Sequence, residues 1–220
     1  MRTNPFYDTW LFLIGQQPDQ LALGPWRWLV VALFLGLLAA SAWIARENWR
    51  RDPAQRNAAD VTIWLFRVLM GAMWFQGSLW KLPLPVSGGF EYWTGQIAEH
   101  AAFAFHRDFA REVLLPNIGL LQTVTVLSEM SFAVSLILGV AVRLFSLLGT
   151  LFALQLWLGL YRHPDEWPWQ YLFIAFTLGQ FAIYGAGRSL GLDALLLHRT
   201  ATRPQGVFGR VFGRVYTLVA

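Results

Sequence analysis

The chain lacks cysteine and is poor in charged residues. Asp, Glu, Lys and Arg make up 14% of its 220 residues, whereas they make up about 25% of an average soluble domain. Without cysteine the polypeptide forms no disulfide, ligates no iron–sulfur cluster and attaches no c-type haem. It also has no phosphate-binding glycine loop, no Ser–His–Asp arrangement and no zinc-ligand spacing. We therefore expect no redox centre on this chain itself.

Apolar residues and tryptophan are abundant instead. Hydrophobic residues make up 56% of the chain, which contains 12 Trp, and the mean hydropathy is +0.43. Five runs are long and apolar enough to span a bilayer, at roughly 26–45, 61–81, 117–142, 144–161 and 167–187. We predict an all-α integral membrane protein, in which the last four spans form a four-helix transmembrane bundle and the first is an additional N-terminal transmembrane helix.

Haem and metal sites are not expected in the predicted spans. All four histidines lie outside the apolar runs, so an intramembrane b-type haem would have no imidazole ligand: His100, His106, His163 and His198. His100 and His106 with Glu99 form the one candidate surface metal site, but a solvated loop face is the expected reading. We expect no haem, no iron–sulfur cluster and no metal on this chain, and no nucleic-acid partner.

The basic residues are distributed unequally between the two sides of the predicted spans. Ten arginines lie on one side, and the other side carries six basic residues offset by eight carboxylates. The positive-inside rule places the first side in the cytoplasm. We predict a multi-pass protein of a bacterial or archaeal cytoplasmic membrane, with its N-terminus and the loop 82–116 outside and its C-terminus in the cytoplasm.

The spans divide the chain into three regions. Residues 1–60 hold the additional helix and a basic cytoplasmic loop, 61–196 form the four-helix membrane domain, and 197–220 form a basic tail. Within the loop 82–116, apolar residues recur at helical spacing over Phe90–Ala101 and Phe105–Val113, which predicts two short amphipathic helices on the outer membrane surface. The repeat GVFGRVFGRVY in the tail predicts either an amphipathic helix on the anionic inner leaflet or a frayed end.

Two charged residues lie inside predicted spans, Arg67 in the second and Glu129 in the third. A charge near the bilayer centre costs about 3 kcal/mol or more, so it normally faces a partner, a cavity or a ligand. At 1.5 Å per residue, Arg67 lies about 9 Å and Glu129 about 20 Å from the inner ends of their helices. We expect that the two long side chains can just meet. Their pair is either structural, or Glu129 relays protons for a redox lipid held between the helices.

Three spans each present one polar stripe at helical period. These stripes cannot face lipid, so we predict that they face the interior of the bundle. Lys81 is expected to be a snorkelling anchor, and the glutamines and Tyr184 are expected to bond between helices or to line a pocket. The stripes are Arg67, Gly71, Trp74, Ser78 and Lys81 in the second span; Gln122, Thr125 and Glu129 in the third; and Thr177, Gln180, Tyr184 and Arg188 in the fifth.

Four motifs occur in an order that resembles the DoxX/DoxD family. They cover roughly residues 62–196: Arg67–x3–Gly71–x5–Gly77–x3–Lys81, then Pro116–Asn117, then Glu129–x9–Gly139–x3–Arg143, then GAGRSLGLDALL from Gly185 to Leu196. The resemblance implies a four-helix membrane subunit. The DoxD branch implies the membrane half of a thiosulfate:quinone oxidoreductase, whereas other members are accessory membrane proteins. Its motif positions here are Arg67, Lys81, Glu129, Arg143, Arg188 and Asp193.

Two functions follow as expectations. The first is a quinone-associated membrane subunit of a respiratory oxidoreductase, with thiosulfate or another sulfur compound as the donor that the resemblance suggests. Quinone would then be the bound cofactor, Glu129 the proton relay, Arg67 its counter-charge, and Trp74, Lys81, Gln180 and Tyr184 the contacts. The alternative is a non-catalytic anchor or assembly subunit of a larger respiratory or photosynthetic complex. Both predict membrane lipids and other subunits as partners, and a transporter is disfavoured by the lack of an inverted repeat.

Overall fold

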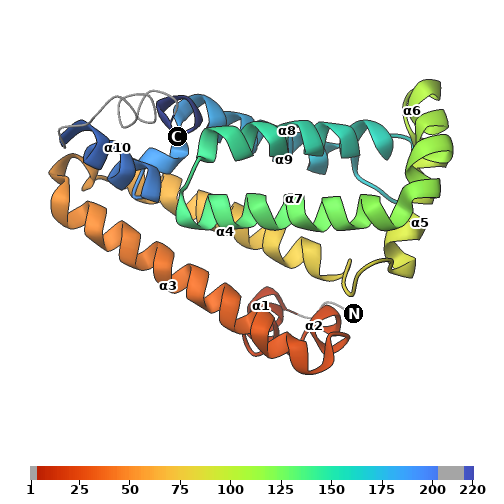
Figure 1. Cartoon of the computed structure of the whole chain (residues 1–220), viewed down its shortest axis with the longest axis horizontal. Coiled ribbons are helices and arrows are strands. Elements are labelled where there is room, and N and C mark those ends of the chain that lie inside the picture. The colour runs from red at the N-terminus through yellow and green to blue at the C-terminus, as the bar shows by residue number, and fades with distance from the viewer. Residues whose placement is uncertain (1–3, 203–215) are drawn as a thin grey trace.

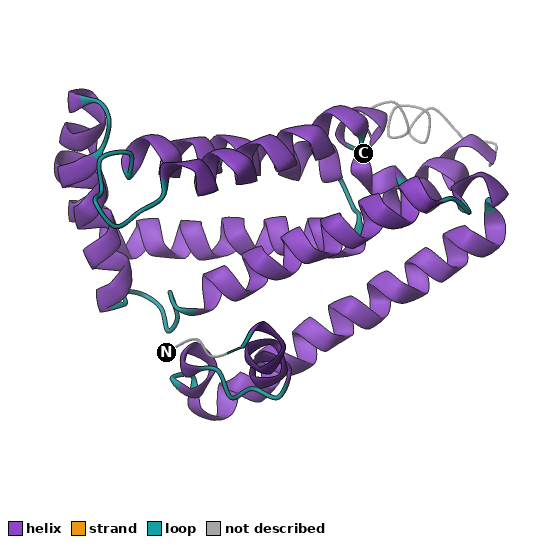
Figure 2. Cartoon of the chain, turned by 180° about the vertical axis from the view of Figure 1, so that it is seen from behind, coloured by secondary structure: helices purple, strands orange, loops and turns teal. Residues whose placement is uncertain are grey.

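The computed structural model describes residues 4–202 and 216–220, which are almost entirely helical and contain no strand (Figures 1 and 2). Within residues 4–202, ten α-helices are joined by short loops and single helical turns. The α-helices are α1 (Pro5–Leu13), α2 (Pro18–Leu21), α3 (Arg27–Arg51), α4 (Ala58–Leu79), α5 (Gly88–His100), α6 (Ala104–Phe109), α7 (Ile118–Leu138), α8 (Val142–Gly159), α9 (Pro168–Tyr184) and α10 (Leu192–Thr202). The short turns are η1 (Gly24–Trp26), η2 (Pro53–Gln55), η3 (Ala110–Leu114, a π-helix), η4 (Leu115–Asn117) and η5 (Ala186–Arg188).

Four helical segments are long and apolar enough to cross a membrane, which indicates a multi-pass membrane protein. They contain α3, α4, α7 and α8, and many of their outward-facing leucines, phenylalanines and tryptophans are exposed on the isolated chain. The segments are Gly24–Arg51, Ala58–Leu79, Ala104–Leu138 and Val142–Gly159. The fifth predicted span corresponds to α9, which has 17 residues.

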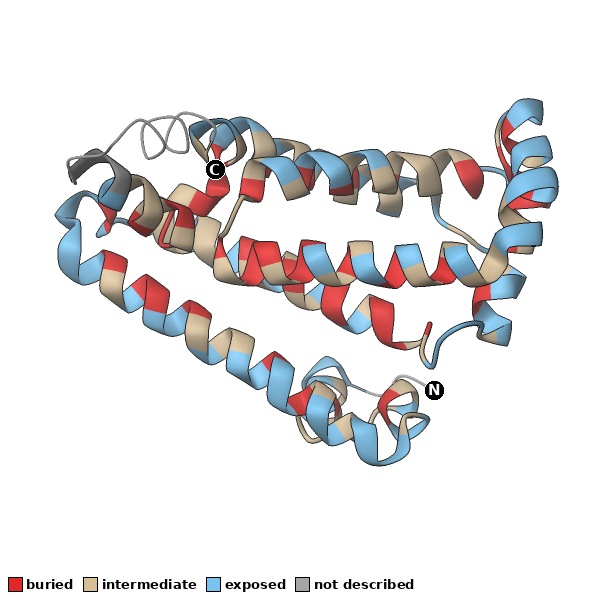
Figure 3. Cartoon of the chain, viewed as in Figure 1, coloured by how far each residue is buried: buried red, intermediate tan, exposed pale blue. Residues whose placement is uncertain are grey.

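The helices pack mainly as two close pairs, α4 with α7 and α8 with α9, and α3 runs obliquely along one side (Figure 1). Gly71 permits the first pair, because a Cβ there would lie 2.7 Å from Ile137 Cγ1 and 3.0 Å from the carbonyl oxygen of Ala133. The absence of a side chain at Gly71 therefore lets α4 and α7 approach each other closely. Buried residues concentrate along the inner faces of α4 and α7, whereas α3 is exposed over much of its length (Figure 3).

One end of the molecule is held together by the turn from Gly185 to Asp193. Side chains from other segments form hydrogen bonds with the backbone of this turn. Asn48 Nδ2 donates to the carbonyl of Gly191 at 2.9 Å, and Gln55 Oε1 accepts from the N–H of Leu190 at 2.7 Å. Gly139 ends α7 with a φ of +73° beside this turn, a conformation that glycine adopts without strain. The GAGRSLGLDALL motif thus forms a junction with α3, η2 and the turn between α7 and α8.

At the other end, α5, α6, η3 and η4 lie across the ends of α7 and α8 (Figure 1). The two short helices predicted within 82–116 are present here. Gln122 fixes the chain between α4 and α5, because its amide donates to the carbonyl of Lys81 and accepts from the N–H of Ser87 at 2.8 Å. The GVFGRVFGRVY repeat lies outside the described residues, apart from Tyr216.

Candidate functional site

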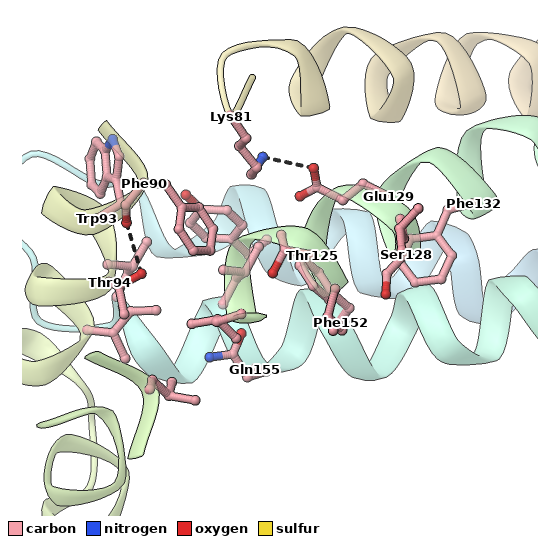
Figure 4. Close-up of a pocket in the computed structure, with 18 of the residues that line it drawn as sticks. Lys81, Phe90, Trp93, Thr94, Thr125, Ser128, Glu129, Phe132, Phe152 and Gln155 are labelled. Carbon is pink, nitrogen blue, oxygen red and sulfur yellow. Dashed lines mark hydrogen bonds and ion pairs between the residues drawn. The ribbon is translucent and has the colours of Figure 1, made fainter. Parts of the chain in front are cut away.

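A cavity of about 930 Å³ lies between α7 and α8 and is bounded at one end by α5. Its walls are mostly apolar and aromatic, with Phe90 and Trp93 on α5, Phe132 on α7 and Phe152 on α8 (Figure 4). Cavities of roughly 300–1,000 Å³ with apolar walls and a few polar groups are typical of small-molecule sites in proteins. This cavity is therefore the first candidate for a binding site in the described part of the chain.

The wall of the cavity contains a buried ion pair between Lys81 and Glu129. Lys81 Nζ lies 2.8 Å from Glu129 Oε2, and the two side chains are only 7% and 6% exposed. Lys81 Nζ also donates to the carbonyl of Gly77 at 2.7 Å and lies 4.2 Å from the centre of the Trp80 ring. The ammonium is thus held by a carboxylate, a carbonyl and an aromatic face, and each of these stabilises its positive charge.

Within the described part of the chain, one carboxylate oxygen of Glu129 has no hydrogen-bond partner. Oε2 accepts the Lys81 bond, and no hydrogen bond within residues 4–202 and 216–220 reaches Oε1. Glu129 lines the cavity from the middle of α7, 11 residues after that helix begins, which is about 17 Å along the helix axis. The free oxygen can therefore accept a hydrogen bond from a ligand inside the cavity.

The structure places Trp74 directly behind the cavity. Its ring packs edge-to-face on Phe132 at 5.3 Å and on Phe152 at 5.7 Å between centroids. Both phenylalanines line the cavity, whereas Trp74 itself does not. Trp74 therefore shapes the wall through its neighbours, and its predicted direct contact with a ligand is not what the structure shows.

Arg67 does not meet Glu129, so the predicted pairing of these two residues is wrong. Arg67 is fully buried, and its Nη1 donates to the carbonyl of Leu136 at 2.6 Å while Nη2 lies 3.5 Å from the carbonyl of Ser189. The partner of Glu129 is Lys81, which was expected to be a snorkelling anchor. Arg67 instead joins α4 and the end of α7 to the junction at Gly185–Asp193, away from the cavity.

Asp193 completes the junction around Arg67. Its carboxylate accepts from the N–H groups of Ala141 at 2.7 Å and Val142 at 3.1 Å, where α8 begins, and from the hydroxyl of Tyr216 at 2.5 Å. Burial raises the pKa of Asp193, and these hydrogen bonds with the charge of Arg67 act in the opposite direction. A carboxylate at the N-terminus of a helix stabilises that helix, so Asp193 stabilises the start of α8.

The polar stripe predicted on α9 does not face the cavity. Gln180 is exposed, Tyr184 is 73% exposed, and the hydroxyl of Thr177 is bonded to the carbonyl of Phe173 in its own helix. The buried face of α9 carries Ala175, Leu178 and Phe181 instead. Gln180 and Tyr184 therefore do not line this cavity, and their role as cofactor-binding residues stays a prediction.

The sequence reasoning missed polar residues at the α5 end of the cavity. Gln155 lines the cavity and lies 3.3 Å from Nε2 of the buried His106. Glu166 Oε2 accepts from the hydroxyl of Tyr171 at 3.0 Å, and both of these residues line the cavity as well. They lie on separate helices and loops at no common period, so no sequence pattern could have grouped them. Within the described residues, no group of three His, Cys, Asp or Glu side chains could hold a metal ion.

Comparisons of the chain with protein-family models, with curated proteins and with solved structures returned no match.

Proposed function

We propose that the chain is a quinone-associated membrane subunit of a respiratory oxidoreductase, with the quinone ring bound in the cavity beside Lys81 and Glu129. The observation that supports this most directly is a buried Lys–Glu pair in the wall of an apolar cavity of about 930 Å³. An isolated ion pair in such surroundings is costly, and residues of this kind in membrane segments mark ligand or proton sites more often than not.

The residues of the cavity fit a quinone in shape and in chemistry. A planar, largely apolar ring can stack against Phe90, Trp93, Phe132 or Phe152. The hydroxyl of a reduced ring can donate to the free Oε1 of Glu129. Reduction of a quinone adds two electrons and two protons to its ring oxygens, and the electrons must come from a partner subunit, because the chain contains no cysteine for an iron–sulfur cluster.

Within this proposal, Glu129 holds and transfers the proton, and the positive charge of Lys81 determines which protonation form of Glu129 is favoured. The ammonium favours the carboxylate form of Glu129, so the group accepts a hydrogen bond from a hydroxyl and takes its proton when the ring is oxidised. In the reverse direction a protonated Glu129 supplies the proton. Arg67 is not part of this chemistry, because its guanidinium is bonded to backbone carbonyls at the junction.

The membrane arrangement proposed with this function has five crossings. We infer that α9 makes the fifth, since it is apolar and packs along the candidate span α8. In this arrangement α4, α7, α8 and α9 form the bundle and α3 is the additional helix. The arginine distribution then places the junction at Gly185–Asp193 in the cytoplasm and α5 outside a bacterial or archaeal cytoplasmic membrane. A sulfur compound such as thiosulfate is the donor suggested by the DoxD resemblance.

A second candidate function, that of an anchor or assembly subunit, is favoured by one observation. Gln180 is exposed on a helix whose neighbouring exposed residues are Phe173, Phe176 and Ile183. An amide facing lipid is unfavourable, so a helix of another subunit would cover it. The two functions are compatible, but only the first requires the cavity.

Purification of the tagged protein in mild detergent, followed by mass spectrometry of co-purified proteins and of extracted quinone, tests the proposal. We expect a redox partner and close to one quinone per chain, and we expect Glu129→Gln to lower quinone reduction by the intact complex at least tenfold. Glu99→Gln is the matched control, because Glu99 lies on α5 and does not line the cavity. A stable complex without quinone, with unchanged turnover in Glu129→Gln, would leave only the anchor function.

A further inference from the structure

Two hydroxyl groups on α7 lack the hydrogen bond within the helix that several other Ser and Thr side chains of this protein make. The usual partner is the carbonyl four residues earlier, at 2.7–2.9 Å, as in Thr94, Thr123, Ser131, Thr150 and Thr177. Within the described residues, no hydrogen bond involves the hydroxyl of Thr125 or of Ser128. Thr125 as a whole is only 7% exposed, and both residues line the cavity, so a ligand there could supply the missing partner.

Both hydroxyls lie in the wall of the cavity, next to Glu129. Thr125 is one helical turn before Glu129 and Ser128 directly precedes it, and all three residues line the cavity from α7 (Figure 4). Together they offer two hydroxyl donors and, at Glu129 Oε1, one carboxylate acceptor. A ligand that both accepts and donates hydrogen bonds would satisfy all three residues.

The cavity is partly open, and exposed residues of α7 and α8 lie along its wall. Among its lining residues, Leu127 is 62% exposed and Leu148 is 44% exposed. Both belong to segments that are long and apolar enough to cross a membrane, whereas Lys81 and Glu129 are buried. The opening therefore faces lipid chains rather than water, and the charged pair lies behind it.

We propose that the hydroxyls of Thr125 and Ser128 donate to the ring oxygens of a membrane-dissolved quinone, that a ring hydroxyl of its reduced form donates to Glu129 Oε1, and that its hydrocarbon tail leaves the protein between Leu127 and Leu148. The site would then bind lipid quinones that carry a hydrocarbon tail. This inference rests on the proposed function and adds to it the recognition groups, the entry route and the class of ligand.

Removal of the hydroxyls tests the recognition groups. The detergent-solubilised full chain is equilibrated with a decyl-tailed benzoquinone, and bound quinone is measured after rapid gel filtration. We expect the double variant Thr125→Val/Ser128→Ala to bind about tenfold more weakly, as expected for two neutral hydrogen bonds. The matched control is Thr123→Val, because the Thr123 hydroxyl is bonded to the carbonyl of Gly119 and the residue does not line the cavity.

Obstruction of the opening tests the entry route. We expect Leu127→Trp and Leu148→Trp to weaken binding of the decyl-tailed quinone at least tenfold, and that of the tail-free benzoquinone ring less than threefold. Leu120→Trp and Leu151→Trp are the controls, since these leucines are 69% and 57% exposed on the same two helices but do not line the cavity. They should change neither affinity.

The possible results separate this inference from the proposed function. If neither quinone binds the wild-type chain, the quinone site itself is wrong and both proposals fail. If the tailed quinone binds wild type and all the hydroxyl and tryptophan variants equally well, only this inference fails. If Leu127→Trp weakens the tailed and the tail-free quinone to the same extent, the tail does not leave between α7 and α8.

Discussion

Lys81 and Glu129 are 48 residues apart in the sequence, yet Lys81 Nζ lies 2.8 Å from Glu129 Oε2. Lys81 directly follows the Ser78–Trp80 turn that ends α4, and Glu129 lies halfway along α7. Their contact therefore ties the loop before α5 to the middle of a neighbouring helix. Because the pair also forms part of the cavity wall, it connects the stability of the fold to the proposed ligand site.

Separating this pair should destabilise the protein strongly. Lys81→Met leaves Glu129 without its counter-charge, and we expect it to lower the free energy of unfolding by about 3 kcal/mol. The double variant Lys81→Met/Glu129→Gln leaves no unpaired charge and should lose distinctly less than the sum of the two single variants. A double-mutant cycle of thermal unfolding midpoints in detergent measures this coupling, and strictly additive losses would show that the two side chains do not interact.

Arg67 should prove to be a structural residue and not part of the ligand site. Lysine at this position keeps the charge but cannot bond both Leu136 and Ser189 through a planar fork, so Arg67→Lys should cost about 2 kcal/mol of stability. The amount of quinone bound per folded chain should stay unchanged. Loss of quinone from folded Arg67→Lys protein would contradict the separation of the junction from the cavity.

Gly139 should tolerate no side chain. A Cβ at this position would overlap the Arg67 guanidinium and lie 2.7 Å from the Cα of Gly191, at a φ of +73°. We expect Gly139→Ala to lower stability by more than about 2 kcal/mol. Gly77→Ala is the matched control, because nothing lies within 4 Å of a Cβ there and alanine favours a helix interior by up to about 1 kcal/mol. Equal thermal midpoints for the two variants would contradict the packing at the junction.

The proposed orientation can be measured with single introduced cysteines, because the natural chain contains none. Gly88 is exposed at the start of α5, and a Cβ there meets nothing within 4 Å. A membrane-impermeant maleimide should therefore label Gly88→Cys in intact cells and label Arg50→Cys only after lysis. The opposite labelling pattern would reverse the orientation while leaving the fold unchanged.

The sequence predicted the buried faces of α4 and α7 correctly. Arg67, Trp74 and Lys81 are all buried, as are Gln122 and Glu129, because widely spaced polar residues in an apolar helix mark its interior face clearly. The same reasoning failed for α9, where Thr177 satisfies its hydroxyl within the helix. That helix packs against α8 through apolar residues, with Leu178 Cδ1 only 3.0 Å from the position that a Cβ on Gly149 would occupy.

The pairing of charges could not be predicted, because it depends on where the chain turns. The positions of Arg67 and Glu129 along their helices predicted that the two side chains could reach each other. Arg67 instead donates a hydrogen bond to the carbonyl of Leu136 near the end of α7. The flexible stem of Lys81 turns back to the carbonyl of Gly77 and so reaches Glu129. The cavity was equally hidden, since its walls come from α5, α7 and α8, and no local pattern reports the distance between helices that are far apart in the sequence.

Photolabelling with a decyl-tailed azidoquinone, followed by peptide mapping, tests the central claim most directly. The account predicts that the ring labels α7 between Leu121 and Phe132 and α5 between Phe90 and Ile97, that excess unlabelled quinone competes, and that Glu129→Gln reduces the yield. Labelling confined to the exposed faces of α3 or α9, without competition, would contradict a quinone site beside Lys81 and Glu129.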